Sequence, residues 1–319
     1  MESYRKLAFT EEVESILAEN NKRLKNIFGT HDQFTGRGME GHIHRVVIDD
    51  YPIRVQWLTE EVFKNDLYQD VLKAGSIKDY TIRFNELYPD SDGINEEDVA
   101  NMLFWARCSR DPSFAFFSLF KIKSKEAGEM IPFELNYAQR YVLSVLEEMR
   151  HKGAPIRIIL LKARQWGGST LVQIYMAWIQ LVHCRNWNSV ICAHLKESAA
   201  NIKGMYSKLL ANYPDWLLDG EKPKFKPFER MANTSVIAGR ECRVTIGSAE
   251  SQESVRGIDA AMAHLSEVAF WRNSRMKSPE QVMRSICGSI MLLPCSMVVM
   301  ESTANGTGSY FHQECERAK

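Results

Sequence analysis

The sequence lacks an excess of charge of either sign. Its 40 Lys and Arg residues balance 40 Asp and Glu residues, so the formal net charge is +0. A field over the whole molecule therefore cannot draw the protein onto nucleic acid or a membrane surface, and any DNA contact must come from a local patch. The 319 residues, 45% of them hydrophobic and 25% charged, indicate an ordinary globular protein with one large domain and a smaller one.

Long apolar runs are also missing. The longest, such as residues 156–161 and 297–300, fall far short of the ~20 residues of a membrane-spanning helix, and the polar start MESYRKLAFTEE has no secretory core. We expect a cytoplasmic protein with no membrane partner. The seven cysteines form no CxxC pair, and their odd number argues against a disulfide framework. They are predicted to be reduced and mostly buried.

The clearest internal boundary is the acidic, turn-rich stretch YPDSDGINEED at residues 88–98. It suggests an N-terminal accessory region at 1–95 and a main domain at 96–319. In the accessory region, residues 10–27 have the pattern of an amphipathic helix, and HIHRVVIDDYPIRVQW alternates like two short strands around a turn at 49–52. The GxGxxG pattern at 36–41 precedes a strand instead of a helix, so we interpret it as a loop.

After this boundary, helices alternate with short apolar strands. Helices are predicted at 95–110 and 111–121. Strands are predicted at 156–161, 189–193, 242–246, 260–265 and 296–301. This alternation predicts an α/β fold with a mostly parallel central sheet flanked by helices, next to a mixed α+β N-terminal extension. Ligands of such sheets bind at the carboxyl ends of the strands.

The strongest functional signal is IRIILLKARQWGGSTLVQIYMAWIQL, an apolar strand, a short loop and a helix starting near Ser169. Such loops bind polyphosphate through converging backbone N–H groups at a helix N-terminus. Against the pattern GxxxxGK[ST], Gly168 replaces the lysine and Lys162 replaces the first glycine. Lys162 or Arg164 can supply the charge instead, and the Ser169 hydroxyl is placed to bind Mg²⁺. The residues alone are equally consistent with an ordinary strand–turn–helix connection that binds no phosphate and carries two basic residues by chance.

Three further segments fit ATP chemistry. Glu267 ends the apolar run IDAAMAHLSE and could orient the attacking water, although a solvated strand-end carboxylate is the simpler interpretation. The segment Ser302-Thr303-Ala304-Asn305-Gly306 follows another strand and could sense the γ-phosphate, or could be an ordinary turn. Gln139 stands at a helix start, and its carboxamide has the donor and acceptor that fit an adenine edge.

KARQWGGST resembles the deviant Walker A loop of tailed-bacteriophage terminase large subunits, in which the lysine often stands at the start of the loop. The resemblance implies a P-loop NTPase of the ASCE/RecA-like division, with Lys162 as the phosphate lysine. It implies that Glu267 is the catalytic glutamate, while Ser266 replaces the Walker B aspartate and binds Mg²⁺ only weakly, through water. The nucleotide-binding residues implied are Gln139, Lys162, Ala163, Arg164, Gln165, Trp166, Gly167, Gly168, Ser169 and Thr170.

Two other matches follow the order of the family's motifs. Arg256, followed by glycine and eleven positions before Glu267, resembles the arginine finger that reaches the γ-phosphate of a neighbouring subunit. Arg164 matches an arginine thought to contact phosphate within its own subunit. The coupling motif implied consists of Ser302, Thr303, Asn305 and Gly306. The matches run from about residue 111 to 311, about two thirds of the chain, and residues before about 95 match nothing in the family.

The resemblance implies an ATPase, with ATP as substrate and Mg²⁺ as cofactor, that drives viral double-stranded DNA into a procapsid. The partners implied are the portal protein of the procapsid, a small terminase subunit and further copies of the chain in a ring, in the host cytoplasm. No nuclease segment is expected before Lys319. Two alternatives remain: another P-loop nucleic-acid translocase or helicase-like ATPase, and a non-hydrolysing nucleotide-binding scaffold module, which the missing loop lysine and Ser266 favour.

Overall fold

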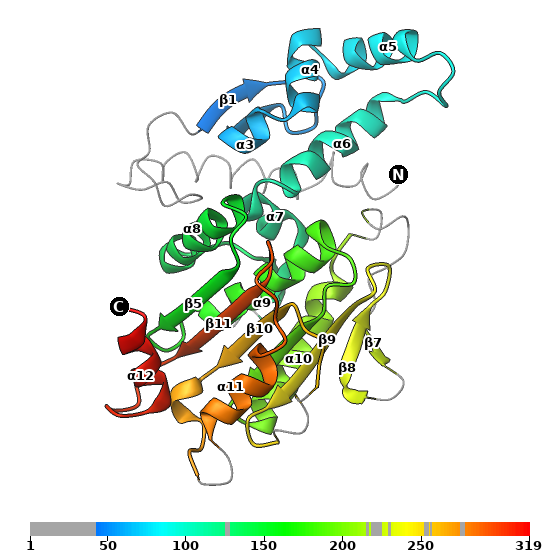
Figure 1. Cartoon of the computed structure of the whole chain (residues 1–319). Coiled ribbons are helices and arrows are strands. Elements are labelled where there is room, and N and C mark those ends of the chain that lie inside the picture. The colour runs from blue at the N-terminus through cyan, green and yellow to red at the C-terminus, as the bar shows by residue number, and fades with distance from the viewer. Residues whose placement is uncertain are drawn as a thin grey trace.

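A seven-stranded, mostly parallel sheet forms the body of the protein (Figure 1). The computed structural model describes residues 43–124, 128–214, 217, 225–228, 231–251, 255, 257–274 and 278–319. In spatial order the strands are β5 (Ile156–Leu161), β11 (Met297–Ser302), β10 (Met262–Ser266), β6 (Ser189–Ala193), β9 (Cys242–Ser248), β8 (Met231–Ile237) and β7 (Phe225–Phe228). Strands β5 to β9 in this order run parallel, and β8 and β7 continue the sheet antiparallel.

The central strands are apolar almost throughout because both faces of the sheet are covered. Every residue of β6, β10 and β11 is buried, as expected where helices pack on both sides of parallel strands. The strands predicted at 156–161 and 189–193 are confirmed to the residue. The other three predicted strands are confirmed with ends that differ by one or two residues. The predicted α/β fold with a mostly parallel sheet is therefore confirmed.

Two hydrophobic clusters lie on opposite faces of this sheet. Because side chains alternate along a strand, Ile191 belongs to one cluster, and its neighbours Val190 and Cys192 belong to the other. The cluster around Ile191 is covered by α7 (Pro112–Leu119), α8 (Tyr137–His151), α9 (Gly168–Trp178) and α10 (Lys196–Ala211). The other cluster is covered by α11 (Pro279–Cys287) and α12 (Tyr310–Arg317).

All seven cysteines lie in the described residues and are free thiols, in agreement with the reduced state predicted from their spacing. Cys108, Cys192 and Cys242 are buried, whereas the other four are only half-buried. The cysteines were predicted to be mostly buried, but only three of the seven are.

Among the described residues, a hairpin and four helices precede the sheet domain (Figure 1, blue to cyan). β1 (Ile43–Val47) pairs antiparallel with β2 (Val55–Thr59), as the alternating pattern predicts. The helices are α3 (Glu60–Phe63), α4 (Asp66–Ala74), α5 (Ile77–Leu87) and α6 (Glu96–Cys108). The helix predicted at 10–27 and the loop predicted at 36–41 lie outside the described residues. A small hairpin of β3 (Lys121–Lys123) and β4 (Met130–Pro132) lies between α7 and α8.

The predicted boundary at 88–98 coincides with the loop between α5 and α6. Asn95, the first residue of the helix predicted at 95–110, caps α6: its side chain accepts from the Asp98 backbone N–H at 3.0 Å, and the Asp98 carboxylate accepts from the Asn95 N–H at 2.9 Å. Such reciprocal bonds satisfy two of the free N–H groups of a helix start. The hydrophobic cluster continues across this loop, since Val46 and Phe104 belong to the same cluster as Tyr175. The two regions of the chain therefore share one core.

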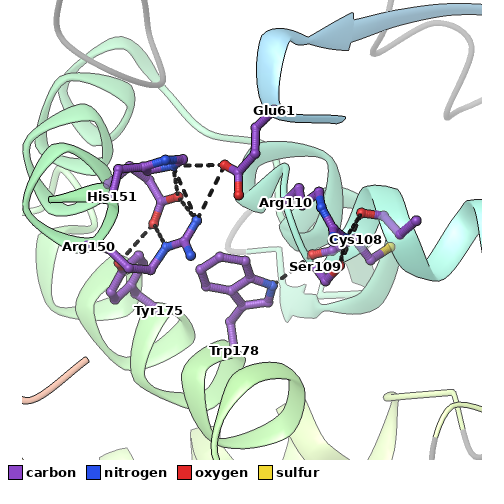
Figure 2. A network of polar contacts seen from close by, with 10 residues as sticks. Glu61, Cys108, Ser109, Arg110, Arg150, His151, Tyr175 and Trp178 are labelled. Atoms are coloured by element: carbon purple, nitrogen blue, oxygen red, sulfur yellow. Dashed lines mark hydrogen bonds and ion pairs between the residues drawn. The ribbon is translucent and has the colours of Figure 1, made fainter. Parts of the chain in front are cut away.

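A network of polar contacts links these regions (Figure 2). Glu147 of α8, 1% exposed, accepts two hydrogen bonds from Arg150, at 2.9 and 2.7 Å, and one from the Tyr175 hydroxyl at 2.8 Å. His151 Nε2 lies 3.4 Å from Glu147 Oε2 and 3.0 Å from Glu61 Oε2, so the imidazole links α8 to α3. The Trp178 indole N–H donates to the Cys108 carbonyl at 3.0 Å and joins α9 to α6.

The carboxylates hold His151 in its charged form. Hydrogen bonds to Glu147 and Glu61 raise the pKa of His151 from 6.5 to about 9, although partial burial works in the opposite direction. A group whose pKa is raised on folding contributes stability that is fully present below its unfolded pKa. This contribution should therefore be complete below about pH 6.5 and lost as the pH rises through about 9.

We expect the His151→Gln variant to lose this pH-dependent part of the stability. The free energy of unfolding, measured in urea for both proteins from pH 6 to pH 9.5, should differ most at pH 6. The difference should shrink toward pH 9.5, where the imidazole of the wild type is mostly neutral. A difference that stays constant over this range would show that His151 acts through packing and not through its charge.

Candidate active site

A tight loop of residues 162–167 joins β5 to α9 at the carboxyl edge of the sheet. The Lys162 N–H donates to the Ser302 carbonyl at 3.0 Å and extends the pairing of β5 with β11 by one residue. Gln165 and Gly167 then adopt left-handed conformations, with φ of 64° and 81°. Gly167 is the N-cap of α9, so the first-turn N–H groups face the loop. This is the predicted strand–loop–helix arrangement, and it offers an anion both amide donors and a helix dipole.

Packing is tight at the two glycines that precede Ser169. A Cβ atom on Gly168 would lie 2.5 Å from the Trp166 ring, so a larger residue there requires the ring to shift. A Cβ atom on Gly167 would lie 2.6 Å from Gln139 Nε2. The backbone conformation favours glycine at 167 and the Trp166 ring favours it at 168, so we expect a cation to reach the loop from another position.

Gln139 is used to hold the loop. Its Oε1 accepts from the Asn136 N–H at 2.9 Å in the capping box of α8, and its Nε2 donates to the Gly167 carbonyl at 3.1 Å. The Asn136 side chain donates to the Trp166 carbonyl at 2.9 Å. The start of α8 is thereby tied to the phosphate loop. The contact of Gln139 with adenine stays a prediction, and it would compete with these bonds.

Lys162 points from the end of β5 toward two carboxylates on the neighbouring strands. Its Nζ lies 2.9 Å from Glu267 Oε1 and 3.6 Å from Glu301 Oε2, and its side chain is only 7% exposed. The strand order explains the contact, because β11 lies between β5 and β10 and all three strands end at the same edge. The predicted phosphate lysine and the predicted catalytic glutamate are therefore neighbours.

The backbone of Glu267 is unusual. The residue follows β10 with φ 55° and ψ 44°. This is the left-handed region, which residues other than glycine and asparagine seldom adopt. Residues in such conformations cluster at functional sites, where the surrounding structure enforces them. Glu267 Oε2 lies 3.4 Å from both the backbone N and the hydroxyl of Thr303 and 3.5 Å from the Ser302 hydroxyl.

The predicted coupling segment is linked to the turn after Glu267. The Ser302 hydroxyl accepts from the Ala269 N–H at 3.1 Å, and the Asn305 side chain donates to the Ala269 carbonyl at 3.0 Å. Gly306 follows with φ 73°, a conformation that suits glycine. Residues 302, 303 and 305 are therefore hydrogen-bonded either to Glu267 or to the turn that follows it.

Glu301 is a site residue that the motif analysis missed. It lies beside Ser266 in the register of β10 and β11 and is fully buried. Its Oε1 accepts from the Ser169 hydroxyl at 2.5 Å and from the Ser266 hydroxyl at 2.9 Å. His264 Nε2 lies 3.2 Å away. The available signal was a lone acidic residue inside the otherwise apolar strand MVVMES.

The surroundings of Glu301 keep it negatively charged. Burial alone would raise the pKa of this carboxyl, but the hydrogen bond and charge of His264, together with Ser169 and Lys162, lower it to about 2. A buried carboxylate is stable only when partners of this kind compensate for its loss of hydration. The site therefore has two anionic side chains, Glu267 and Glu301, around one lysine.

The structure brings together the predicted residues Lys162, Ser169, Ser266, Glu267, Ser302 and Thr303. Ala163, Arg164 and Gln165 are exposed on the loop, and Thr170 is half-buried in the first turn of α9. Arg256, the predicted arginine finger, lies outside the described residues. Of the helices that the structure describes, none combines the length and apolar character required to cross a bilayer.

Gly167→Ala should destabilise the protein, because alanine at φ 81° is strained and its methyl group would displace the Gln139 amide. We expect a loss of about 1–3 kcal/mol in the free energy of unfolding. Gly204→Ala, at an exposed position of helix α10, is the matched control. A Cβ there meets no atom of the described residues within 4 Å, and alanine should stabilise the helix by up to about 1 kcal/mol. Equal effects in the two variants would contradict the assigned loop conformation.

Solved phage terminases are similar to this structure. The HK97 bacteriophage large terminase is 17% identical with a TM-score of 0.50, and the match covers 64% of this chain and 40% of that one. The Thermus phage P74-26 large terminase ATPase domain is 17% identical with a TM-score of 0.36, and the match covers 50% of this chain and 63% of that one. A mutant of that domain is 15% identical with a TM-score of 0.34, over 50% of this chain and 64% of that one.

No family model and no curated protein matches the sequence. The chain spans 40% of the length of the HK97 large terminase. At 17% identity that likeness concerns the fold, and it agrees with the predicted P-loop NTPase architecture of a mostly parallel sheet flanked by helices. Over about two thirds of its length, the chain therefore has the fold of a bacteriophage large terminase.

Proposed function

We propose that the protein is an ATPase that binds MgATP at the carboxyl ends of β5, β10 and β11. The observation that carries this proposal is the meeting of Lys162 and Glu267, 2.9 Å apart, beside the Ser169 hydroxyl at the start of α9. A cation, a carboxylate and a loop with free N–H groups are the components that hydrolysis of a triphosphate requires. Three separate segments of the chain supply them.

In this proposal the phosphates lie against the N-terminus of α9, where the loop amides and the helix dipole favour negative charge. The Lys162 ammonium then moves toward the phosphate oxygens, which compete with Glu267 and Glu301 for it. Once released from the lysine, the Glu267 carboxylate is free to accept a hydrogen bond from the attacking water. Binding of the triphosphate and activation of the water are thereby coupled through one lysine.

The residues around the loop fit a magnesium ion. Mg²⁺ prefers oxygen ligands and is usually held by one or two carboxylates together with substrate phosphates. The Ser169 hydroxyl is the ligand predicted from the loop, with Ser266 as a weaker partner through water. The buried Glu301 Oε2 lacks a hydrogen-bond donor among the described residues, which suits contact with a cation. When bound, the ion neutralises charge that develops on the phosphate oxygens.

We extend the proposal to the packaging of double-stranded viral DNA into a procapsid. The support is the fold shared with the HK97 large terminase and the order of the motifs along the chain. Residues 302–305, bonded to Glu267 and to the turn after it, provide a route from the phosphate site to a moving element. The proposed partners are the portal protein, a small terminase subunit and further copies in a ring, with Arg256 as the arginine finger, in the host cytoplasm.

A non-hydrolysing nucleotide-binding scaffold is the second candidate. Gly168 and Ser266 favour it, because neither carries the charge that the corresponding motif positions usually have. A helicase-like translocase shares the hydrolysis proposed here, and it would need a second RecA-like domain or its own characteristic motifs. Measurement of turnover separates the scaffold from both of the motors.

The Glu267→Gln variant should keep its affinity for ATP and lose most of its hydrolysis. Loss of a positioned general base lowers the rate by about 10²–10⁴-fold, whereas the amide still fits among Lys162, Ser302 and Thr303. Phosphate release should be measured beside binding of a fluorescent ATP analogue. Absence of turnover in the wild type would support the scaffold, and full turnover in the variant would remove Glu267 from the chemistry.

Lys162→Ala should weaken binding of ATP severely and also lower the melting temperature. The first effect follows from loss of the cation near the phosphates, and the second from two carboxylates left without it, one of them buried. Arg164→Ala, on the exposed part of the same loop, is the matched control and should leave the melting temperature unchanged. Unchanged affinity for ATP in Lys162→Ala would reject this residue as the phosphate lysine.

A further inference from the structure

We propose that Glu301, on β11, supplies the carboxylate that holds the magnesium ion of MgATP. This inference rests on the proposed nucleotide site and assigns a ligand within it. Ser266, at the end of β10, is uncharged, and the buried negative charge of the site stands instead on the neighbouring strand. Ser266 and Glu301 are direct partners in the register of the two strands, so the carboxylate is displaced by one strand and stays at the same edge of the sheet.

The position of Glu301 next to the loop hydroxyl supports this role. Its Oε1 accepts from the hydroxyls of both Ser169 and Ser266. Ser169 is the first-turn residue of α9, which a cation between phosphates and protein would contact. The carboxylate therefore reaches the same point as the loop hydroxyl, from the opposite side.

The second oxygen of Glu301 supports a ligand more directly. Oε2 is buried and accepts no hydrogen bond from any described residue, although Lys162 Nζ lies 3.6 Å away. A buried carboxylate oxygen without a hydrogen bond is costly, and such atoms in a native structure call for an explanation. Contact with a divalent cation would compensate for this cost when MgATP binds and Lys162 turns to the phosphates.

Glu267 is less suited to the same role. It is 32% exposed, compared with 0% for Glu301, and its oxygens face Lys162 and the residues that follow β11. Its position suits contact with water, whereas Glu301 lies deeper and against Ser169. In this proposal Glu267 therefore contacts the attacking water, and Glu301 binds the metal.

The test measures how strongly MgCl₂ tightens binding of a fluorescent ADP derivative. In the wild type, affinity in MgCl₂ should exceed affinity in EDTA. Glu301→Gln keeps the size of the side chain and removes the charge, so this enhancement should fall by at least about tenfold, the lower end of the loss caused by removing even an outer partner of a metal ligand. Electron paramagnetic resonance of Mn²⁺ with ADP should show less bound metal.

Two variants serve as controls. Glu267→Gln should retain the metal-dependent gain in affinity, because this carboxylate is assigned to the water. The double variant Ser266→Asp/Glu301→Gln returns a carboxylate to β10 and should recover most of the gain. Melting temperatures of all variants would show whether each is folded, and recovery in the double variant would show that the loss in Glu301→Gln was not caused by unfolding.

The outcomes separate this inference from the proposed function. If Glu301→Gln keeps the full gain from MgCl₂, or loses affinity equally in MgCl₂ and EDTA, Glu301 is not the metal ligand, whether or not the wild type hydrolyses ATP. Metal-dependent binding without turnover in the wild type would overturn the proposed ATPase and leave the assignment of Glu301 standing. Failure of the wild type to bind the nucleotide at all would overturn both.

Discussion

The contact of one buried lysine with two carboxylates is the constraint on which the site depends. Lys162 ends β5, Glu267 follows β10, and Glu301 lies near the end of β11, so the three meet only when β11 lies between the other two strands. Each charge is costly to bury alone and is stabilised by the others. The order of the strands therefore places the lysine where it can compensate the charges of both carboxylates.

The loop shows how packing changes a motif while keeping its chemistry. Trp166 fills the space over Gly168, where a lysine is usual, and Gln139 fills the space beside Gly167. We infer that Lys162 supplies the cation instead, and that the metal carboxylate is likewise displaced, from the position of Ser266 to Glu301 on the adjacent strand. In both cases the charge arrives at the same edge of the sheet from a different backbone position, because the edge collects side chains from several strand ends.

The N-terminal region contributes to the stability of the domain that carries the site. Its residues share a hydrophobic cluster with the sheet, and Glu61 joins the charge network of α8 through His151. The same α8 begins with Asn136 and Gln139, which hold the phosphate loop. One helix thus contacts the accessory region at its end and the loop at its start.

The sequence by itself determined local features: five of the seven strands of the sheet to within two residues, the start of the helix near Asn95, and the strand–loop–helix around Lys162. These follow from short-range patterns of polarity, capping and glycine. Only the tertiary structure decided which distant side chains meet. Glu301 appeared as one acidic residue in an apolar strand, and Gln139 was predicted to contact adenine and not to hold the loop. Their contacts with Ser169 and Gly167 depend on the pairing of β11 between β5 and β10 and on the packing of α8, which no local pattern encodes.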